Sequence, residues 1–466
     1  MDKVKKVAMR RLDMDLKNKY VLVAGCGISG TNAAQLLYNT GAIPILYDGN
    51  EQLKKEDIEK KIPENSKIEI LIGNLSQEII DSLSLVVLSP GIPADTEFAD
   101  GFRKKNIPVW GEVELAYQFA KGELVAITGT NGKTTTTALT GQIMKDYYES
   151  VFIVGNIGNA YTKEALNTNE KSVTVAEISS FQLETIECFK PHVSAILNIT
   201  PDHLNRHHTM DNYVAIKQAI TSNQTADDFC VLNHEDEYLK AFVSKCTAKI
   251  IWFSSKQELK DGYYLSGDII CKAVNGKKEE LLNIHDMKLL GLHNVENVMA
   301  AIAMSEAFGV PMNSILTTVK EFRAVEHRIE YVATKKGVDY YNDSKGTNPD
   351  AAIQGIKAMN RQTVLIGGGY DKQSTYDEWI ESFGGKVKCL VLIGQTRDKI
   401  AECAKKHNFT NIMMADSLEE AMDICERETV PGEAVLLSPA CASWGMFPNY
   451  EVRGKMFKEL VMKIKE

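Results

Sequence analysis

The chain has 466 residues, and because a single hydrophobic core stops growing well below that length, we expect two to four domains and favour three. Its formal net charge of −9 argues against nucleic acid or an anionic membrane surface as the main partner. Nine cysteines without a C-x-x-C pair, a charged N-terminus and no run of about 18 apolar residues predict a reduced cytoplasmic protein with no membrane span and no cysteine zinc site.

Apolar runs bounded by Gly, Asn or Asp alternate with helix-period segments along the chain, which is typical of βαβ units and parallel sheets. In the first block, strands are predicted at 20–24, 43–47 and 85–88. The first strand leads into Gly25-x-Gly27-x-x-Gly30, and Asp48 closes the second, which together match the dinucleotide fingerprint. These glycines provide a tight turn and an exposed helix N-terminus, which suit any diphosphate. A nicotinamide and a nucleotide-linked substrate therefore both fit this block.

The second block opens with an apolar strand at 124–128 that runs into a glycine-bracketed loop ending in Lys-Thr. In such a loop the backbone N–H groups and Lys133 bind a triphosphate, and the Thr134 hydroxyl holds Mg²⁺. The general P-loop pattern needs a glycine where Ile127 stands, so this loop is shorter, and a plain Gly-Asn-Gly turn is the alternative. The Lys-Thr pair favours ATP, and hence a nucleotide-linked substrate in the first block. The residues predicted to bind the nucleotide here are Gly129, Thr130, Asn131, Gly132, Lys133, Thr134 and Thr135.

Strands at 173–176 and 193–197 and a helix at 294–308 are predicted to continue this block. Glu177 closes the first of these strands, and a carboxylate at the tip of a parallel sheet suits a hard cation. Asp202 and His203 follow the second strand, so we expect them at the same sheet edge as the phosphate loop. Lys217 comes later on a helix, and its residue type alone indicates a solvated surface lysine.

The third block runs from about Arg328, with strands predicted at 340–341, 363–366, 389–393 and 434–437 and a helix at 397–406. His327-Arg328 and the segment 341–348 combine an acid with two cations, as binding of a γ-phosphate and a carboxylate acceptor requires. Either segment alone is compatible with an ordinary turn. The sequence thus predicts an α/β protein of three domains: Rossmann-like at 1–111, a P-loop-type ATPase with a mainly parallel sheet at 112–324, and Rossmann-like at 325–466.

Seven segments, in order and across nearly the whole chain, resemble the Mur ligase family: TGTNGKT at 128–134, GNIG at 155–158, EISSFQLE at 177–184, HNVEN at 293–297, HR at 327–328, NDSK at 342–345 and SPACAS at 438–443. Three of these segments, EISSFQLE, NDSK and SPACAS, resemble the family members that add D-glutamate rather than their sister enzymes. The resemblance implies a monomeric, cytoplasmic enzyme of bacterial peptidoglycan synthesis. It would use ATP to join D-glutamate to UDP-N-acetylmuramoyl-L-alanine (UDP-MurNAc-L-Ala) through an acyl phosphate.

The same resemblance implies residue roles, and it replaces the surface interpretation of one lysine. The expected catalytic residues are Lys133, Glu177, His203 and Lys217. Two Mg²⁺ ions would be held by Thr134, Glu177, His203 and a carbamylated Lys217. ATP would also contact Asn294, Asn297, Arg328, Asp343 and Lys345. The other two substrates would contact Ile28, Ser29, Asp48, Asn156, Ser179, Gln182, Thr347, Lys372, Ser443, Trp444 and Tyr450.

Two departures from the family pattern concern substrate contacts rather than the reaction: Gly445 stands where relatives often carry an acid, and Gly49-Asn50 lacks an arginine that some relatives place near uracil. Another ligase of the same family, adding a different amino acid or adding glutamate to folate, is the main alternative. A nucleotide-sensing scaffold with a decayed site is a second, and the presence of Lys133, Glu177, His203 and Lys345 argues against it.

Overall fold

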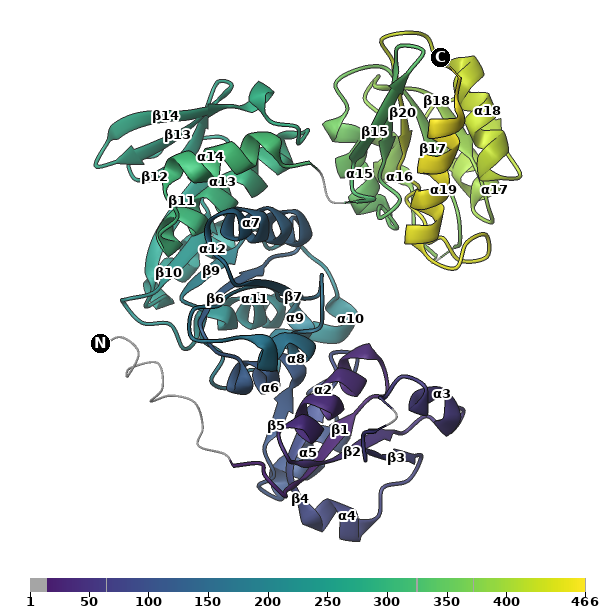
Figure 1. Ribbon diagram of the computed structural model, residues 1–466. Coiled ribbons are helices and arrows are strands. Elements are labelled where there is room, and N and C mark those ends of the chain that lie inside the picture. Colours follow the sequence, from purple (N-terminus) through teal and green to yellow (C-terminus); the bar gives the residue numbers. More distant parts are fainter. Residues whose placement is uncertain (1–14, 64, 324–325, 372, 466) are drawn as a thin grey trace. The chain divides into compact units, whose positions relative to one another are not determined.

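The computed structural model describes residues 15–63, 65–323, 326–371 and 373–465. The chain forms two compact units: one comprises the residues up to Ile284 together with Glu296–Val319, and the other comprises His285–Val295 together with the residues from Lys320 onward. The described strands form three sheets, two in the first unit and one in the second (Figure 1). None of the described helices combines the length and apolar character that crossing a bilayer requires.

The N-terminal part of the first unit alternates strands and helices. Its elements are β1 Tyr20–Ala24, α2 Ile28–Asn39, β2 Ile43–Asp48, α3 Lys55–Glu59, β3 Glu69–Ile72, α4 Gln77–Ser82, β4 Leu83–Leu88, α5 Glu97–Lys104, β5 Val109–Gly111 and α6 Glu112–Phe119. The strands are all parallel, in the order β3-β2-β1-β4-β5. Val21 and Val23 pack in one core and Leu22 and Ala24 in another, because helices cover both faces of this sheet.

The central part of the chain begins at β6 and carries a larger sheet. Its elements are β6 Glu123–Thr128, α7 Lys133–Tyr147, β7 Val151–Gly155, α8 Tyr161–Glu164, β8 Val173–Glu177, α9 Ser180–Leu183, β9 Val193–Ile196, α10 Leu204–His207, α11 Met210–Gln218, β10 Phe229–Asn233, α12 Glu237–Phe242, β11 Lys249–Ser254, β12 Gly262–Ser266, β13 Ile269–Val274, β14 Lys277–Asn283, α13 Leu292–Phe308 and α14 Met312–Glu321. The strand order is β14-β13-β12-β11-β10-β9-β6-β8-β7. The strands from β7 to β12 are parallel, whereas β13 and β14 are added antiparallel.

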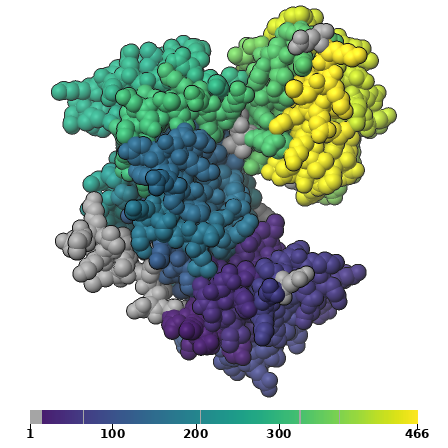
Figure 2. Space-filling model, in the orientation of Figure 1, coloured from purple at the N-terminus to yellow at the C-terminus, as the bar shows by residue number. Residues whose placement is uncertain are grey.

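The C-terminal part forms the sheet of the second unit. Its elements are β15 Glu330–Lys335, β16 Val338–Asn342, α15 Pro349–Ala358, β17 Thr363–Gly367, α16 Asp377–Glu381, β18 Val387–Leu392, α17 Arg397–Lys406, β19 Ile412–Met414, α18 Leu418–Glu428, β20 Ala434–Leu437 and α19 Tyr450–Lys463. The order is β15-β16-β20-β17-β18-β19, and only β15 pairs antiparallel among these described strands. One core holds α15, α16 and α17, and the other holds α18 and α19. The C-terminal residues, which include α19, form the yellow surface in Figure 2.

The predicted α/β class with three sheet-bearing parts is confirmed, and the predicted strands at 20–24, 173–176 and 434–437 match β1, β8 and β20 to within one residue. The antiparallel extension β12–β14 was not predicted. Its signal was the dipeptide Asn275-Gly276, where both residues have positive φ, 51° and 77°, as a two-residue type I′ hairpin requires. The domain boundaries at 111/112 and 324/325 stay predictions.

Candidate functional site

The phosphate loop, residues 129–134, connects β6 to α7 at the edge of the sheet where parallel strands end. Gly129 and Gly132 have positive φ, 150° and 85°, a region that favours glycine. A Cβ added at Gly132 would lie 2.2 Å from Oδ1 of Asn297, which lies on α13, so a larger residue does not fit there. The loop is therefore built around its two glycines, with the N-terminus of α7 directly after them.

Asn198, just beyond β9, holds the loop in place. Its Oδ1 accepts a 2.8 Å hydrogen bond from the Asn131 backbone N–H, and its Nδ2 donates to the Asn131 carbonyl at 3.1 Å. The Thr130 hydroxyl donates to the Thr200 carbonyl at 3.1 Å. Asn198 was not among the predicted site residues, although its position directly after a predicted strand is a signal for such a role.

Two lysine amines converge on one carbonyl of the phosphate loop. Lys133 Nζ donates to the Gly129 and Thr130 carbonyls, both at 2.9 Å. Lys217 Nζ, from α11, donates to the same Gly129 carbonyl at 2.7 Å. Two amine nitrogens are thus gathered at this loop in a chain whose net charge is −9.

Lys217 is buried, with 1% of its surface exposed, so its interpretation as a solvated surface lysine is wrong. Its Nζ also lies 4.6 Å from the centroid of the Tyr213 ring. Burial, and then the nearby Lys133 charge, lowers the pKa of Lys217 to about 6, against an opposing effect of Asp202. The amine is therefore mostly neutral at pH 7, the form that reacts with electrophiles.

Glu177 ends β8 beside the phosphate loop, because β8 pairs with β6 through Ile127 and Glu177. The carboxylate is fully buried, and its Oε1 accepts a 2.9 Å hydrogen bond from Asn156 Nδ2. Its Oε2 has no hydrogen-bond partner among the described residues. A buried carboxylate oxygen without a donor is the group expected at the site of a hard cation.

His203 is placed differently from Glu177. It sits in a left-handed backbone conformation (φ 52°) before α10, and its side chain is half exposed. Its Nε2 lies 3.4 Å from Asp202 Oδ2, and its ring lies 4.9 Å from the ring of Phe181. Assignment of His203 as a metal ligand stays a prediction.

Ser179 and Gln182 form a capping box at the start of α9, so both side chains already serve the local fold. Gln182 Nε2 also donates to the buried Glu112 Oε1 at 2.7 Å. Burial raises the pKa of Glu112. Ser179 and Gln182 were predicted to contact substrate. In the structure Gln182 also links α9 to α6 through its hydrogen bond to Glu112.

An ion-pair cluster that the sequence analysis missed lies next to this segment, and we call it the Glu184 cluster: Glu184, Arg206 and His207. The Arg206 guanidinium donates two hydrogen bonds to the Glu184 carboxylate, at 3.0 and 2.6 Å. It also donates to the Ile92 carbonyl at 3.0 Å. His207 Nε2 bonds to Ser180 Oγ at 2.9 Å, and burial lowers the pKa of His207. Glu184 stands in the EISSFQLE segment, but nothing in the spacing of Glu184 and Arg206 along the chain pairs them. The cluster links the loop after β4 to α9 and α10.

Replacing Glu184 by alanine is expected to destabilise the first unit by about 3 kcal/mol, because it leaves the Arg206 guanidinium largely buried without its carboxylate. The two side chains are each only 10% exposed. Urea denaturation followed by fluorescence measures the effect as a lower transition midpoint. Asp57→Ala is the matched control, because the Asp57–Lys60 pair is exposed and its loss should leave the midpoint unchanged. Equal midpoints for Glu184→Ala and Asp57→Ala would contradict this role.

In the N-terminal sheet, the predicted contacts cluster around the first glycine turn. Ile28 begins α2 and is 77% exposed, and Ser29 follows it. Asp48 Oδ2 accepts the Cys26 backbone N–H at 3.1 Å, so this carboxylate shapes the turn between β1 and α2. Gly30 must be glycine, since an added Cβ would lie 1.8 Å from the Gly25 carbonyl oxygen.

In the second unit, Asp343 and Arg328 lie near each other in a buried setting. Asp343 is 3% exposed, and its Oδ2 accepts a 2.6 Å hydrogen bond from Ser438 Oγ. Burial raises the pKa of Asp343 to about 7, against the opposing Ser438 bond and the Arg328 charge. Arg328 Nε is buried without a hydrogen-bond partner among the described residues. Burial, and then the Arg328 charge, lowers the pKa of His293 to about 4, so these groups of the HNVEN and HR motifs interact.

The remaining predicted residues of this unit surround the ends of β16 and β20. Lys345 Nζ lies 5.8 Å from the Tyr450 ring centroid, and the Thr347 N–H donates to the Lys345 carbonyl at 2.9 Å. Ser443 is buried, whereas Trp444 is 53% exposed and packs edge-on against Tyr370. The structure thus brings these residues to one sheet end.

Asn294, Gly445 and Lys372 are further positions of interest in this unit. Asn294 Nδ2 donates to the Leu290 carbonyl at 2.7 Å at the start of α13. Gly445 has φ 86° with open space at its Cβ position, so backbone conformation rather than crowding accounts for the glycine. Lys372 lies outside the described residues.

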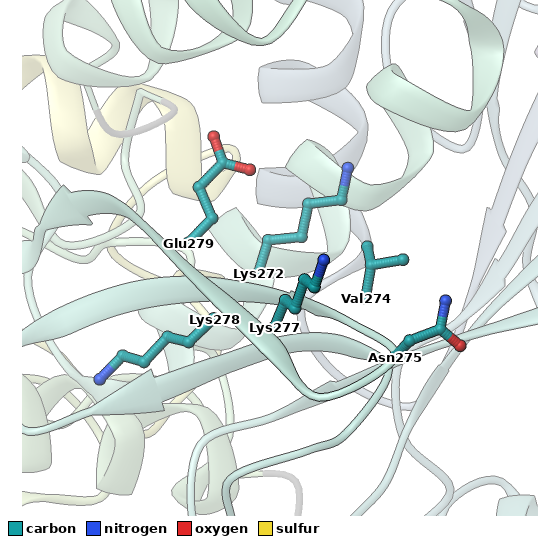
Figure 3. Close-up of a pocket in the computed structure, with 6 residues that line it drawn as sticks. All are labelled: Lys272, Val274, Asn275, Lys277, Lys278 and Glu279. Carbon is teal, nitrogen blue, oxygen red and sulfur yellow. The ribbon is translucent and has the colours of Figure 1, made fainter.

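A hollow of about 400 Å³ lies apart from these residues on the β13–β14 hairpin (Figure 3). It is lined by Lys272, Val274, Asn275, Lys277, Lys278 and Glu279. Lys272 is paired with Glu306 at 2.6 Å, and the lining residues belong to the antiparallel extension rather than to the loop edge of the sheet. We assign no function to it.

Comparison with known proteins gives a consistent result along the chain. Three family models match: the Mur ligase MurD-like N-terminal domain at 19–111, the Mur ligase middle domain at 127–305, and the Mur ligase glutamate ligase domain at 327–441. A UDP-N-acetylmuramoylalanine--D-glutamate ligase of Lachnospira eligens is 59% identical, over 96% of this chain and 99% of its own. An enzyme of the same name from Lachnoclostridium phytofermentans is 56% identical, over 97% and 100%.

Solved structures show the same fold at low sequence identity. The UDP-N-acetylmuramate-alanine ligase MurC of Thermotoga maritima has a TM-score of 0.60 at 19% identity, covering 96% of this chain and all of that one. A MurF structure from Acinetobacter baumannii has a TM-score of 0.61 at 16% identity, covering 91% of each chain. The architecture of three α/β domains is therefore shared with these proteins.

Proposed function

This chain belongs to the Mur ligase family, and we propose that it is the member that joins D-glutamate to UDP-MurNAc-L-Ala, with conversion of ATP to ADP and phosphate. Relatives that carry this enzyme name are 59% and 56% identical over almost the full length. The product is an intermediate of peptidoglycan synthesis, and the enzyme is an ATP-dependent amide ligase.

The reaction requires two anions to meet. The γ-phosphoryl group of ATP passes to the alanyl carboxylate and forms an acyl phosphate. The D-glutamate amine then attacks the acyl carbon, and phosphate leaves. The task of the protein is to position these groups and offset their repulsion. Lys133 and the N–H groups of the phosphate loop would do this, and the presence of the Lys133 amine at that loop supports the assignment.

The residues at the loop edge fit Mg²⁺. The buried Glu177 Oε2 lacks a hydrogen-bond donor among the described residues, and carboxylate and hydroxyl oxygens are the ligands a hard cation prefers. Thr134 and Glu177 would hold one ion, and His203 with a modified Lys217 would hold a second. When bound, Mg²⁺ neutralises the phosphate oxygens.

We further propose that Lys217 is carbamylated, and the observation that carries the proposal is its buried amine on the Gly129 carbonyl. Because its pKa is lowered to about 6, the neutral amine can attack CO₂ at neutral pH. The neutral amine forms an N–C bond with CO₂ and releases one proton, so an uncharged amine becomes a carboxylate-like anion. That charge suits a metal ligand beside the triphosphate, where a buried ammonium would not.

For the other substrates we propose that the turn around Ile28 and Ser29, with Asp48 behind it, binds the UDP-sugar. The exposed N-terminal turn of α2 supports this, since backbone N–H groups there suit a diphosphate. Thr347, Lys372 and Ser443 would bind D-glutamate, with a lysine and two hydroxyls as donors to carboxylates. Asn156, Ser179 and Gln182 would lie at the reacting carboxylate. Trp444 and Tyr450 would border the amino-acid site.

Replacing Lys372 by alanine is expected to raise the KM for D-glutamate far more than the KM for ATP or UDP-MurNAc-L-Ala. One buried charge-assisted hydrogen bond contributes about 1.5–3 kcal/mol, which corresponds to about 10-fold to 100-fold in KM. Steady-state kinetics with each substrate varied in turn measures the three values. Lys463→Ala, at the exposed end of α19, is the control. Equal effects on all three substrates would place the D-glutamate carboxylates elsewhere.

We also propose that the enzyme is a cytoplasmic monomer. The nine cysteines are free in the structure, which is compatible with a reducing compartment. Analytical ultracentrifugation of the full chain tests the monomer: sedimentation at about twice the chain mass of 51.8 kDa would contradict it.

Substrate choice is tested by ADP release with a panel of amino acids and acceptors. D-glutamate with UDP-MurNAc-L-Ala should be the productive pair. Turnover with a different amino acid, or with a folate acceptor and L-glutamate, would favour another ligase of the same family. Nucleotide binding without phosphate release in every combination would favour a sensing scaffold.

A further inference from the structure

A cluster of potential metal ligands lies in the C-terminal part of the chain, outside every residue assigned above. Asp377 and Glu381 stand four residues apart on α16, and Cys403 and His407 stand four residues apart at the end of α17. One ligand atom each from Asp377, Cys403 and His407 lie within 4.8 Å of one another. Because residues four apart share a face of a helix, each helix presents a pair toward the other.

The two helices are held by a packed core beneath the cluster. Trp379 and Ile380 on α16 and Ile400 and Ala404 on α17 are buried in the same hydrophobic core. These residues alternate with the polar pairs along each helix, so burial of one face fixes where the polar face points. The positions of the cluster therefore do not depend on a mobile loop.

A carboxylate lies next to each ring nitrogen of His407, which gives the imidazole the orientation of a metal ligand. His407 Nε2 lies 2.9 Å from Asp377 Oδ1, and His407 Nδ1 lies 3.5 Å from Glu381 Oε1. A metal-bound histidine usually donates its second N–H to a carboxylate, which fixes the tautomer. Glu381 occupies that second place, and Nε2 faces Asp377.

The thiol completes the set. Cys403 is half-buried on α17. Its Sγ lies within 4.8 Å of a ligand atom of Asp377 and of His407.

We propose that Asp377, Cys403 and His407 bind a divalent transition-metal ion of the zinc type, with Glu381 orienting His407. A sulfur, nitrogen and oxygen set suits Zn²⁺ or Co²⁺ and not Mg²⁺, which prefers oxygen ligands alone. Binding releases the thiol proton, so the cation is held by the Cys403 thiolate, the neutral His407 imidazole and the Asp377 carboxylate, and a water molecule fills the fourth position. Bonds of about 2.0–2.3 Å place tetrahedral ligand atoms about 3.3–3.8 Å apart, so side-chain movements on the order of 1 Å complete the site.

Such a site would connect α16 to α17. Asp377 follows Tyr376, whose hydroxyl lies 3.2 Å from Cys441 Sγ in the SPACAS segment. The metal would therefore stabilise the end of the 367–376 loop, and its effect is expected in thermal stability rather than in the chemistry at the phosphate loop. The site contains no C-x-x-C pair, so that spacing did not predict it: Asp377 comes from α16, and Cys403 and His407 stand four residues apart at the end of α17.

Titration of the metal-free full-length protein with Co²⁺ tests the proposal. Cobalt bound to a thiolate gives a sulfur-to-metal charge-transfer band in the near ultraviolet, which an all-oxygen magnesium site cannot give. We expect the band to saturate at one cobalt per chain, and added Zn²⁺ to abolish it. Cys403→Ser should remove the band, and Glu381→Gln should weaken cobalt affinity by about 10-fold to 100-fold while keeping the band.

Cys188→Ser is the matched control, because Cys188 is also partly buried but lies in the first unit. It should titrate as the unchanged protein does. Far-ultraviolet circular dichroism of each variant separates loss of ligation from loss of folding, and His407→Gln gives a second ligand variant should Cys403→Ser fail to fold. Absence of a thiolate band in the unchanged protein, or its survival in Cys403→Ser, would overturn the proposal.

Discussion

Replacing Lys133 by alanine is expected to lower ATP-dependent turnover by about 10³-fold or more while leaving the fold intact. The lysine is the first residue of α7, and its amine lies at the carbonyls of the phosphate loop rather than in a hydrophobic core. Its removal therefore takes away positive charge that offsets phosphate repulsion, and little packing. Steady-state ADP release measures the loss.

Lys145→Ala is the matched control for this variant, because Lys145 lies in the last turn of the same helix and is exposed. It should keep normal turnover. Near-normal turnover by a folded Lys133→Ala enzyme would contradict the nucleotide assignment of the loop. A parallel loss of helical circular dichroism would instead indicate a structural role for Lys133.

Replacing Lys217 by alanine is expected to abolish turnover, and a short carboxylic acid such as acetate or formate should restore part of it. If the working side chain is a carbamate, a small carboxylate in the cavity left by the lysine can supply the missing oxygen ligand. Surface lysines show no such rescue, and Lys240→Ala on α12 is the control. Full activity of Lys217→Ala without added acid would remove the carbamate proposal.

The pH dependence of the unchanged enzyme gives an independent test. Carbamylation uses the neutral amine, and the pKa of Lys217 is lowered to about 6 from its ordinary value of 10.5. Activation by added bicarbonate should therefore be present at pH 7–8 and be lost as the pH falls through about 6. A lysine with its ordinary pKa would show activation only at strongly alkaline pH.

Much of the fold could be predicted because strands buried on both faces are continuous apolar runs bounded by Gly, Asn or Asp. The strands at 20–24 and 434–437 are of this kind and match β1 and β20. The hairpin strand β14 could not be recognised in this way, since five consecutive positions from Lys277 to Leu281 are not buried. Its stability comes from pairing with β13, a contact that periodicity does not reveal.

The candidate site was predictable where a residue ends a strand, as Glu177 does, because parallel strand ends meet at one edge. Lys217 was a different case. Its burial depends on Tyr213 and the Gly129 carbonyl, which packing brings to it, so residue type alone gave the opposite interpretation. Arg206 and Glu184 likewise pair only through the fold.

The measurement that tests the central proposal most directly is D-glutamate-dependent ADP formation with UDP-MurNAc-L-Ala and Mg²⁺-ATP. We predict that ADP forms only when both UDP-MurNAc-L-Ala and D-glutamate are present, in equal amount to an amide product whose mass is that of the two joined with loss of one water. Equal ADP formation with L-glutamate, or ADP formation with no amide product, would contradict the proposal.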